Sequence, residues 1–111
     1  MASKIPQPLS VFSVLSDPTR LRILRLLITT QKEPCLCELS DALDDSASNL
    51  SRHLKSLREA GLLTARKDGR WIYHRAAKHQ DFSPLFQFIS KASSVAIDQD
   101  IRRLKKRLKL R

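Results

Sequence analysis

The two cysteines of this 111-residue chain, Cys35 and Cys37, are separated by a single residue and are the clearest candidates for chemistry. Thiolate sulfur prefers soft, thiophilic ions, so the pair predicts a site for a metal or metalloid ion. Ser40 follows Cys37 by about one helical turn, but a neutral hydroxyl is a poor ligand for such an ion. A third donor would therefore come from solvent or from a small thiol, unless the pair suffices alone.

Two other interpretations of the cysteine pair stay open. The thiols could form a redox pair, although a disulfide across one residue would be strained. They could also be two small packed residues that bind nothing. A disulfide scaffold is excluded, because the chain has only these two cysteines.

A helix that begins at Pro34 would position both cysteines in its first turn. The partial positive charge at a helix N-terminus favours thiolate over thiol there. In a regular helix, residues i and i+2 point about 200° apart, so the two sulfurs would lie on opposite flanks. Binding one ion through both sulfurs should then distort this turn and shift the helix.

Residues 35–61 carry two apolar patterns of helical spacing, joined by the polar turn Asp44-Asp45-Ser46. Two short helices set at an angle by such a turn predict a helix-turn-helix, whose second helix enters the DNA major groove. The plainer alternative is two core helices of a small bundle. The expected buried faces are Leu36, Leu39 and Leu43 in the first helix, and Leu50, Leu54 and Leu57 in the second.

The face of the second helix opposite its leucines is small, polar and cationic. Small residues let a helix approach base edges, and arginine can bridge a guanine in two places. Arg52, Ser48 and Ser51 are therefore the strongest candidates for base contacts, and Asn49 could read an adenine at a less favourable angle. The predicted DNA-binding residues of this helix are Ser46, Ser48, Asn49, Ser51, Arg52 and Lys55.

Residues 62–77 predict a β-hairpin, because Asp68-Gly69 separates two β-prone runs. A basic hairpin directly after a helix-turn-helix is typical of the wing in a winged helix. Its cations would contact phosphates or the minor groove, and those predicted to bind DNA are Arg66, Lys67 and Arg70. The alternative is a solvated charged turn.

The segments on either side are predicted to be helical. Helices are expected at 8–15 and at 18–29, the latter with Asp17 as N-cap and Pro18 in its first turn. A single long helix is expected over 82–110. Its apolar stripes are too long to be buried by so small a domain, so a helix of a second subunit should cover them. A basic segment that lies on an anionic membrane is the alternative.

The charge and composition limit the class of protein. A formal charge of +10 indicates a polyanionic partner, most often nucleic acid. No apolar run approaches a membrane span and no signal peptide is recognisable, so we expect a cytoplasmic protein without membrane contact. No nucleophile, base and orienting group cluster, so an enzyme is not expected. The expected fold is mainly α (α+β), a single winged helix-turn-helix domain over 1–111.

Four segments together resemble the ArsR/SmtB family of metal-responsive repressors, over roughly residues 8–100. They are DPTRLRIL at 17–24, CLCEL at 35–39, LSRHLKSLREAGLL at 50–63 and RKDGRWIYHR at 66–75. The resemblance implies a homodimer that binds double-stranded operator DNA when metal-free and leaves it when the effector binds. A DNA-binding regulator that responds to thiol redox state or to no ligand is the alternative.

The resemblance also implies an effector and an interface. Arsenic sensors of the family use Cys-x-Cys-x-x-Cys on this helix, which makes As(III) or Sb(III) the expected effector at Cys35 and Cys37, with no organic cofactor. Ser40 departs from that pattern and puts the third ligand in doubt. In the family the first and last helices form the dimer interface, so the predicted interface residues are Leu9, Phe12, Leu85, Ile89, Ile97, Ile101, Leu104 and Leu108.

Overall fold

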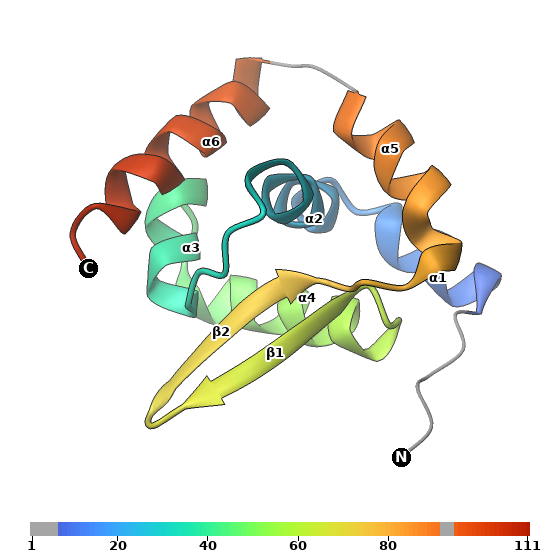
Figure 1. Ribbon diagram of the computed structural model, residues 1–111, viewed down its shortest axis with the longest axis horizontal. Coiled ribbons are helices and arrows are strands. Elements are labelled where there is room, and N and C mark those ends of the chain that lie inside the picture. Colours follow the sequence, from blue (N-terminus) through green and yellow to red (C-terminus); the bar gives the residue numbers. More distant parts are fainter. Residues whose placement is uncertain (1–6, 92–94) are drawn as a thin grey trace.

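The computed structural model describes residues 7–91 and 95–111 of the chain. Five other α-helices and one β-hairpin surround the central helix α2 in this part of the chain (Figure 1). In order, the elements are α1 (Pro8–Leu15), α2 (Pro18–Thr30), α3 (Leu36–Leu43), α4 (Ala47–Glu59), β1 (Leu63–Asp68), β2 (Trp71–Ala76), the 3-10 turn η1 (Gln80–Phe82), α5 (Ser83–Lys91) and α6 (Val95–Leu108). The predicted winged helix-turn-helix is confirmed.

Local sequence signals set the helix boundaries. The Asp17 carboxylate accepts hydrogen bonds from the backbone N–H groups of Thr19 and Arg20 at 2.8 and 3.1 Å, which caps α2 as predicted. Ser46 caps α4 by accepting from the Asn49 N–H at 3.1 Å. Gly61 ends that helix region with φ of 81°, a left-handed conformation that glycine adopts without a Cβ clash.

The core lies between α2 and the helix-turn-helix. The apolar side of α2 packs against the leucine face of α4, and α3 packs against α4 and α6, because each apolar face repeats at helical spacing. Leu36 is only half-buried, in contrast to the other five predicted core leucines. The buried residues at this junction are Ile23, Leu24, Leu26, Leu27, Leu39, Leu43, Leu50, Leu54 and Leu57.

The wing is a two-stranded antiparallel hairpin. Asp68 pairs with Trp71, so the connecting loop is Gly69-Arg70. Gly69 has φ of 63°, the positive value that a tight two-residue hairpin loop requires. Only the base of the hairpin is buried, and its cationic tip extends from the domain (Figure 1).

The C-terminal region corrects the expectation of one continuous helix over 82–110. The structure has two helices, α5 and α6, which run in different directions over the two sides of α2 (Figure 1). Helix α6 packs on α3 and α2 of the same chain, and Leu104 is fully buried there. Leu104 of the apolar stripe is thus covered within the chain, and Ile101 and Leu108 are partly covered. No helix of the described residues is long and apolar enough to cross a membrane.

Candidate functional site

The sulfur atoms of Cys35 and Cys37 lie 3.1 Å apart. This differs from the expected placement on opposite flanks of a helix. Helix α3 begins at Leu36 rather than at Pro34, and Cys35 is its N-cap with extended backbone angles of φ −85° and ψ 174°. The extended N-cap directs the Cys35 side chain toward Cys37, so both sulfurs can contact one ion without unwinding the helix.

The two thiols differ in exposure. Cys37 is exposed, whereas Cys35 is buried. Burial raises the pKa of the Cys35 thiol to about 11, and the contact with Cys37 adds to the effect. The expected stabilisation of thiolate at the helix N-terminus is therefore outweighed by desolvation at Cys35, which carries its proton at neutral pH.

Two arginines from the C-terminal end of the chain border the cysteine pair. Arg107 Nη2 lies 3.8 Å from Cys37 Sγ, and Arg111 binds both carboxylate oxygens of Glu38 at 2.7 Å. Neither arginine was predicted as part of this site, because their distance from Cys37 in the sequence gives no sign of contact. They enclose a cavity of about 230 Å³ that is lined by Cys35, Cys37, Glu38, Trp71, Tyr73, Arg107 and Arg111.

Glu38 connects this arginine pair to the cysteines. Its carboxylate accepts a hydrogen bond from the Cys35 backbone N–H at 3.0 Å. The Arg111 guanidinium and this N–H hold the pKa of Glu38 at about 2, despite its burial. The ionised Glu38 thus fixes the N-cap conformation that brings the sulfurs together.

Ser40, the expected weak ligand, is directed to the turn that follows α3. Its hydroxyl donates to the Asp45 carbonyl oxygen at 2.5 Å. Within residues 7–91 and 95–111, no three His, Cys, Asp or Glu side chains are grouped to hold a metal ion. The donor set that the structure brings together is two sulfurs, which suits a thiophilic ion that accepts a non-protein third ligand.

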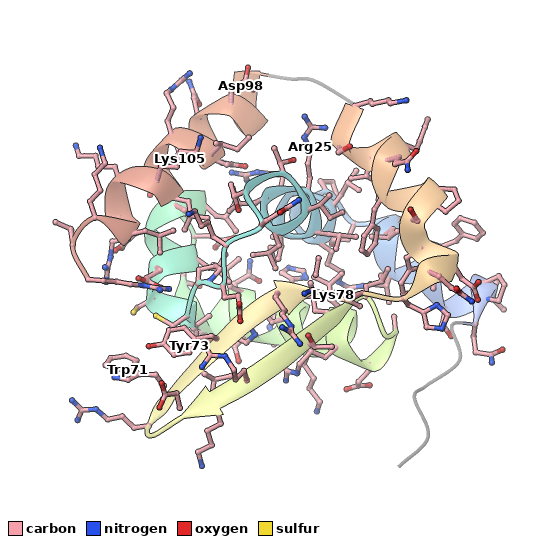
Figure 2. The ribbon with its side chains drawn as sticks, in the orientation of Figure 1. Arg25, Trp71, Tyr73, Lys78, Asp98 and Lys105 are labelled. Carbon is pink, nitrogen blue, oxygen red and sulfur yellow. The ribbon has the colours of Figure 1, made fainter. Side chains whose placement is uncertain are left out.

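The cysteine pair is joined to the wing through β2. Cys35 forms an isolated antiparallel bridge with Tyr73, and the His74 N–H donates to the Pro34 carbonyl oxygen at 2.9 Å. Trp71 and Tyr73 extend from the wing toward the N-terminal end of α3 (Figure 2). A groove of about 560 Å³ continues from the cysteines past Ser51 of α4 to Arg70 of the wing.

The predicted DNA-contacting residues of α4 lie on its outer face. Ser46, Ser48, Ser51, Arg52 and Lys55 are exposed, and Asn49 is half-buried. Arg52 Nη2 donates to Asn49 Oδ1 at 2.8 Å, which orders the guanidinium on this face. The arrangement places a cation among small polar groups, as contact with base edges requires.

The wing cations differ in their present partners. Arg66 contacts the Glu33 carboxylate at 3.5 Å and stacks over Tyr73, so part of its charge is already balanced. Arg70 lies over the Trp71 ring at 5.5 Å, and Lys67 is exposed. Arg70 and Lys67 at the hairpin tip are therefore the wing residues best placed for phosphate contact.

The predicted interface residues separate into two groups. Leu9 and Phe12 of α1 are strongly exposed, at 84% and 65%, and so is Phe88 of α5 at 76%. Leu85 is half-buried. In contrast, Ile89 and Leu104 are buried, and Ile101 and Leu108 pack against the core of the same chain. The side chain of Ile97 lies outside the described residues. Among the interface candidates whose side chains the structure describes, the strongly exposed ones are thus on α1 rather than on α6, and Phe88 adds an exposed side chain on α5.

Comparisons with known proteins agree with this architecture. The profile of the "bacterial regulatory protein, arsR family" matches residues 17–65. The solved structure of reduced HlyU from Vibrio cholerae superposes with a TM-score of 0.65 and 27% identity, over 74% of this chain and 83% of that one.

Two curated relatives extend the match. The arsenical resistance operon repressor of Escherichia coli is 47% identical over 72 residues, which are 65% of this chain but only 61% of that protein. An uncharacterized HTH-type transcriptional regulator of Methanocaldococcus jannaschii is 37% identical over 71 residues, and 79% of its length is covered. The chain therefore belongs to the arsR family of bacterial regulatory proteins, which are transcriptional regulators rather than enzymes.

Proposed function

We propose that this chain is a repressor that binds operator DNA as a homodimer and is released when trivalent arsenic or antimony binds Cys35 and Cys37. The observation that carries the proposal is the 3.1 Å separation of the two sulfurs at a helix end that is bridged to the wing. The name of the Escherichia coli relative, an arsenical resistance operon repressor, supports the same effector.

The sulfur geometry favours a pyramidal ion over a tetrahedral one. If each sulfur lies about 2.3 Å from a bound ion, the observed separation of 3.1 Å gives a sulfur–ion–sulfur angle of about 85°. Tetrahedral zinc would require the sulfurs to be about 3.8 Å apart. Trivalent arsenic and antimony carry a lone pair and bond in a pyramid with smaller angles, so they fit the pair with less movement.

The route from ion to DNA passes through the wing root and α4. Replacing the proton on buried Cys35 by an ion changes the N-cap of α3, which is joined to β2 by the Cys35–Tyr73 bridge and the His74–Pro34 hydrogen bond. Leu54 of α4 lines the same groove as the cysteines. If bound DNA weakens ion binding at this site by some factor, the bound ion must weaken DNA binding by the same factor, by linkage.

The dimer is proposed from the exposed apolar residues of α1 and α5. Leu9, Phe12 and Phe88 are large apolar side chains in water, and a second copy would cover them. Two recognition helices can then read two half-sites about one helical turn apart. We also infer a cytoplasmic location, where the two thiols stay reduced.

The test measures operator release by the reduced full-length protein. An operator is first obtained by selection from random duplex DNA, and complexes are followed by fluorescence anisotropy during titration with arsenite, antimonite, zinc and cadmium. Arsenite and antimonite should release the DNA at near-stoichiometric amounts. Cys35→Ser and Cys37→Ser should each bind operator normally but resist release, because one thiolate cannot chelate.

A thiol redox response is the second candidate, because the same 3.1 Å separation brings the sulfurs close to bonding distance. Release by hydrogen peroxide, reversed by dithiothreitol and without response to arsenite, would select this candidate. If operator complexes survive both arsenite and hydrogen peroxide in large excess over the protein, both proposed effectors are rejected. The protein would then bind DNA without a ligand response.

A further inference from the structure

A trivalent ion held by Cys35 and Cys37 needs a third ligand. No neighbouring side chain provides a third sulfur. The chain has no further cysteine, and the Ser40 hydroxyl is engaged with the Asp45 carbonyl. Arsenite in water carries three hydroxyl groups, so a retained hydroxyl is the simplest third ligand. A retained oxygen would be stabilised by a nearby hydrogen-bond donor.

Arg107 of α6 is fixed beside the sulfurs in a position to donate. Its Nε donates to Asp41 Oδ2 at 2.6 Å, and its Nη1 lies 3.9 Å from Glu38 Oε2. These carboxylates on α3 hold the planar guanidinium in place. Its Nη2 donates to Cys37 Sγ at 3.8 Å, a long and weak hydrogen bond that a closer oxygen acceptor would replace.

The space around these atoms suits a small oxygen ligand. Arg107 and the two cysteines line the same cavity of about 230 Å³, which is larger than a single hydroxyl needs. Trp71 and Tyr73 of the wing, labelled in Figure 2, also line this cavity. The Arg107 guanidinium is therefore the hydrogen-bond donor that α6 places in this cavity, beside Cys37.

We infer that Arg107 recognises the oxygen that arsenite keeps when it binds the cysteine pair. The inference rests on the proposed function. In the step, As(OH)₃ reacts with two thiols to give (RS)₂As–OH and two waters. Two As–O and two S–H bonds break, two As–S bonds and the two new O–H bonds of the waters form, and no oxidation state changes. The remaining As–OH oxygen accepts a charge-assisted hydrogen bond from Arg107 Nη2. Arg107 thereby makes the two-sulfur site selective for inorganic arsenite.

Phenylarsine oxide separates this role from a structural one. Its arsenic reacts with the same two thiols and loses its oxygen as water, so the third substituent is a phenyl carbon that accepts no such hydrogen bond. The probe therefore reports on the cysteine pair alone. Trp71 is the only tryptophan of the chain and lines the cavity, so its fluorescence can follow both titrations.

The experiment compares the full-length protein with Arg107→Ala under reducing conditions. The matched control is Arg102→Ala, which removes the same charge from an exposed position of α6 outside the cavity lining. Arg107→Ala should bind arsenite about tenfold more weakly or worse, the effect of one charged hydrogen bond. It should bind phenylarsine oxide within about twofold of wild type, and Arg102→Ala should resemble wild type with both probes.

Three other outcomes would contradict either the role of Arg107 or the proposed function. Equal arsenite affinity in Arg107→Ala and wild type would overturn the inference and leave the proposed function intact. An equal loss for both probes would also overturn it, because Arg107 would then only support the fold around the cysteines. A wild type that binds neither probe would reject the proposed effector itself.

Discussion

Arg22 of α2 and Asp100 of α6 form a bidentate ion pair that fastens the C-terminal helix to the body of the domain. Arg22 Nη2 and Nε lie 2.7 and 3.0 Å from the two carboxylate oxygens. Arg103 also donates to Asp100 at 2.9 Å and to the Ala42 carbonyl oxygen at 2.6 Å. Because Asp100 is only 1% exposed, these two arginines supply its counter-charges in place of water.

Replacing this carboxylate should loosen α6. Asp100→Asn leaves the Arg22 guanidinium, which is one-third exposed, without its counter-charge. We expect the free energy of unfolding to fall by about 2–3 kcal/mol, somewhat less than for a fully buried pair. Urea denaturation followed by circular dichroism measures the change. Asp98→Asn, on the exposed side of the same helix, is the control and should change stability by less than about 0.5 kcal/mol. Equal effects of the two variants would contradict a stabilising role for the ion pair.

Glu38 should make stability depend on pH on the acid side. Its pKa is lowered from 4.5 to about 2 in the folded chain, chiefly by Arg111. A depressed pKa stabilises the fold above the unfolded-state value, and this contribution is lost as pH falls from about 4.5 to about 2. Glu38→Gln should therefore lower stability by roughly 2–3 kcal/mol at pH 7, with allowance for the hydration of Arg111, and by much less near pH 2.

Unfolding by urea at a series of pH values checks this dependence. Glu59→Gln is the matched control, because Glu59 is exposed and lies 4.0 Å from an equally exposed Lys55. Such a surface pair contributes between zero and about 1 kcal/mol, so the control should follow the wild-type curve closely. A Glu38→Gln curve parallel to wild type from pH 7 to pH 2 would show that Arg111 does not stabilise the carboxylate.

Two apolar positions should respond in opposite ways to a new charge. Phe12→Asp adds the charge to the exposed face of α1, so the chain should stay folded and sediment as a monomer. Leu104→Asp buries an unpaired carboxylate in the core and should unfold the chain or destabilise it by several kcal/mol, about 3 or more. Analytical ultracentrifugation and circular dichroism distinguish these results. A folded dimer of Phe12→Asp would move the interface away from α1.

The two DNA-facing elements should differ in what they contribute. Arg52→Ala should weaken operator binding by about 1–3 kcal/mol and relax the sequence preference, because Arg52 lies on the outer face of α4. Arg70→Ala should weaken binding to all sequences more evenly and reduce the salt slope by about one unit, as expected for one lost phosphate contact. Binding to operator and to unrelated DNA at several salt concentrations tests both. A purely non-specific loss in Arg52→Ala would contradict base contact.

The third ligand position can be filled by design. Ser40→Cys places a thiol one turn after Cys37 on the same helix, so it should lower the arsenite concentration needed for operator release. Ser40→Ala should respond almost normally to arsenite, since the hydroxyl donates to the Asp45 carbonyl instead of binding the ion. The comparison uses release midpoints in the anisotropy assay. A lost arsenite response in Ser40→Ala would make the hydroxyl a ligand after all.

Short-range signals were sufficient to predict most of the elements. The caps at Asp17 and Ser46 and the leucine spacing act within a few residues, so they can be recognised in the sequence. The Asp68-Gly69 pair likewise predicted the hairpin, although its two-residue loop is Gly69-Arg70, one residue later. These signals predicted α1 through the wing to within about two residues and placed Arg52, Ser48 and Ser51 on one exposed face. The Cys35/Cys37 pair was recognised for the same reason, since its spacing is local.

The errors concern residues whose position depends on distant contacts. The continuous helix over 82–110 was inferred from an apolar stripe, and periodicity shows that a face is buried without showing what buries it. In the structure that surface is α3 and α2 of the same chain, fixed by Arg22 and Asp100. The sulfur separation was misjudged because one residue, Cys35, is the N-cap rather than part of the helix.

The sequence by itself determined the helix-turn-helix, the wing, the cationic face of α4 and the presence of a thiol pair, because periodicity, caps and turns are encoded within a few neighbouring residues. Only the tertiary structure decided that the thiols lie 3.1 Å apart and that Arg107 and Arg111 border them. Seventy positions separate Arg107 from Cys37, and their contact exists only because α6 folds back on α3 to bury Leu104 and to pair Asp100 with Arg22.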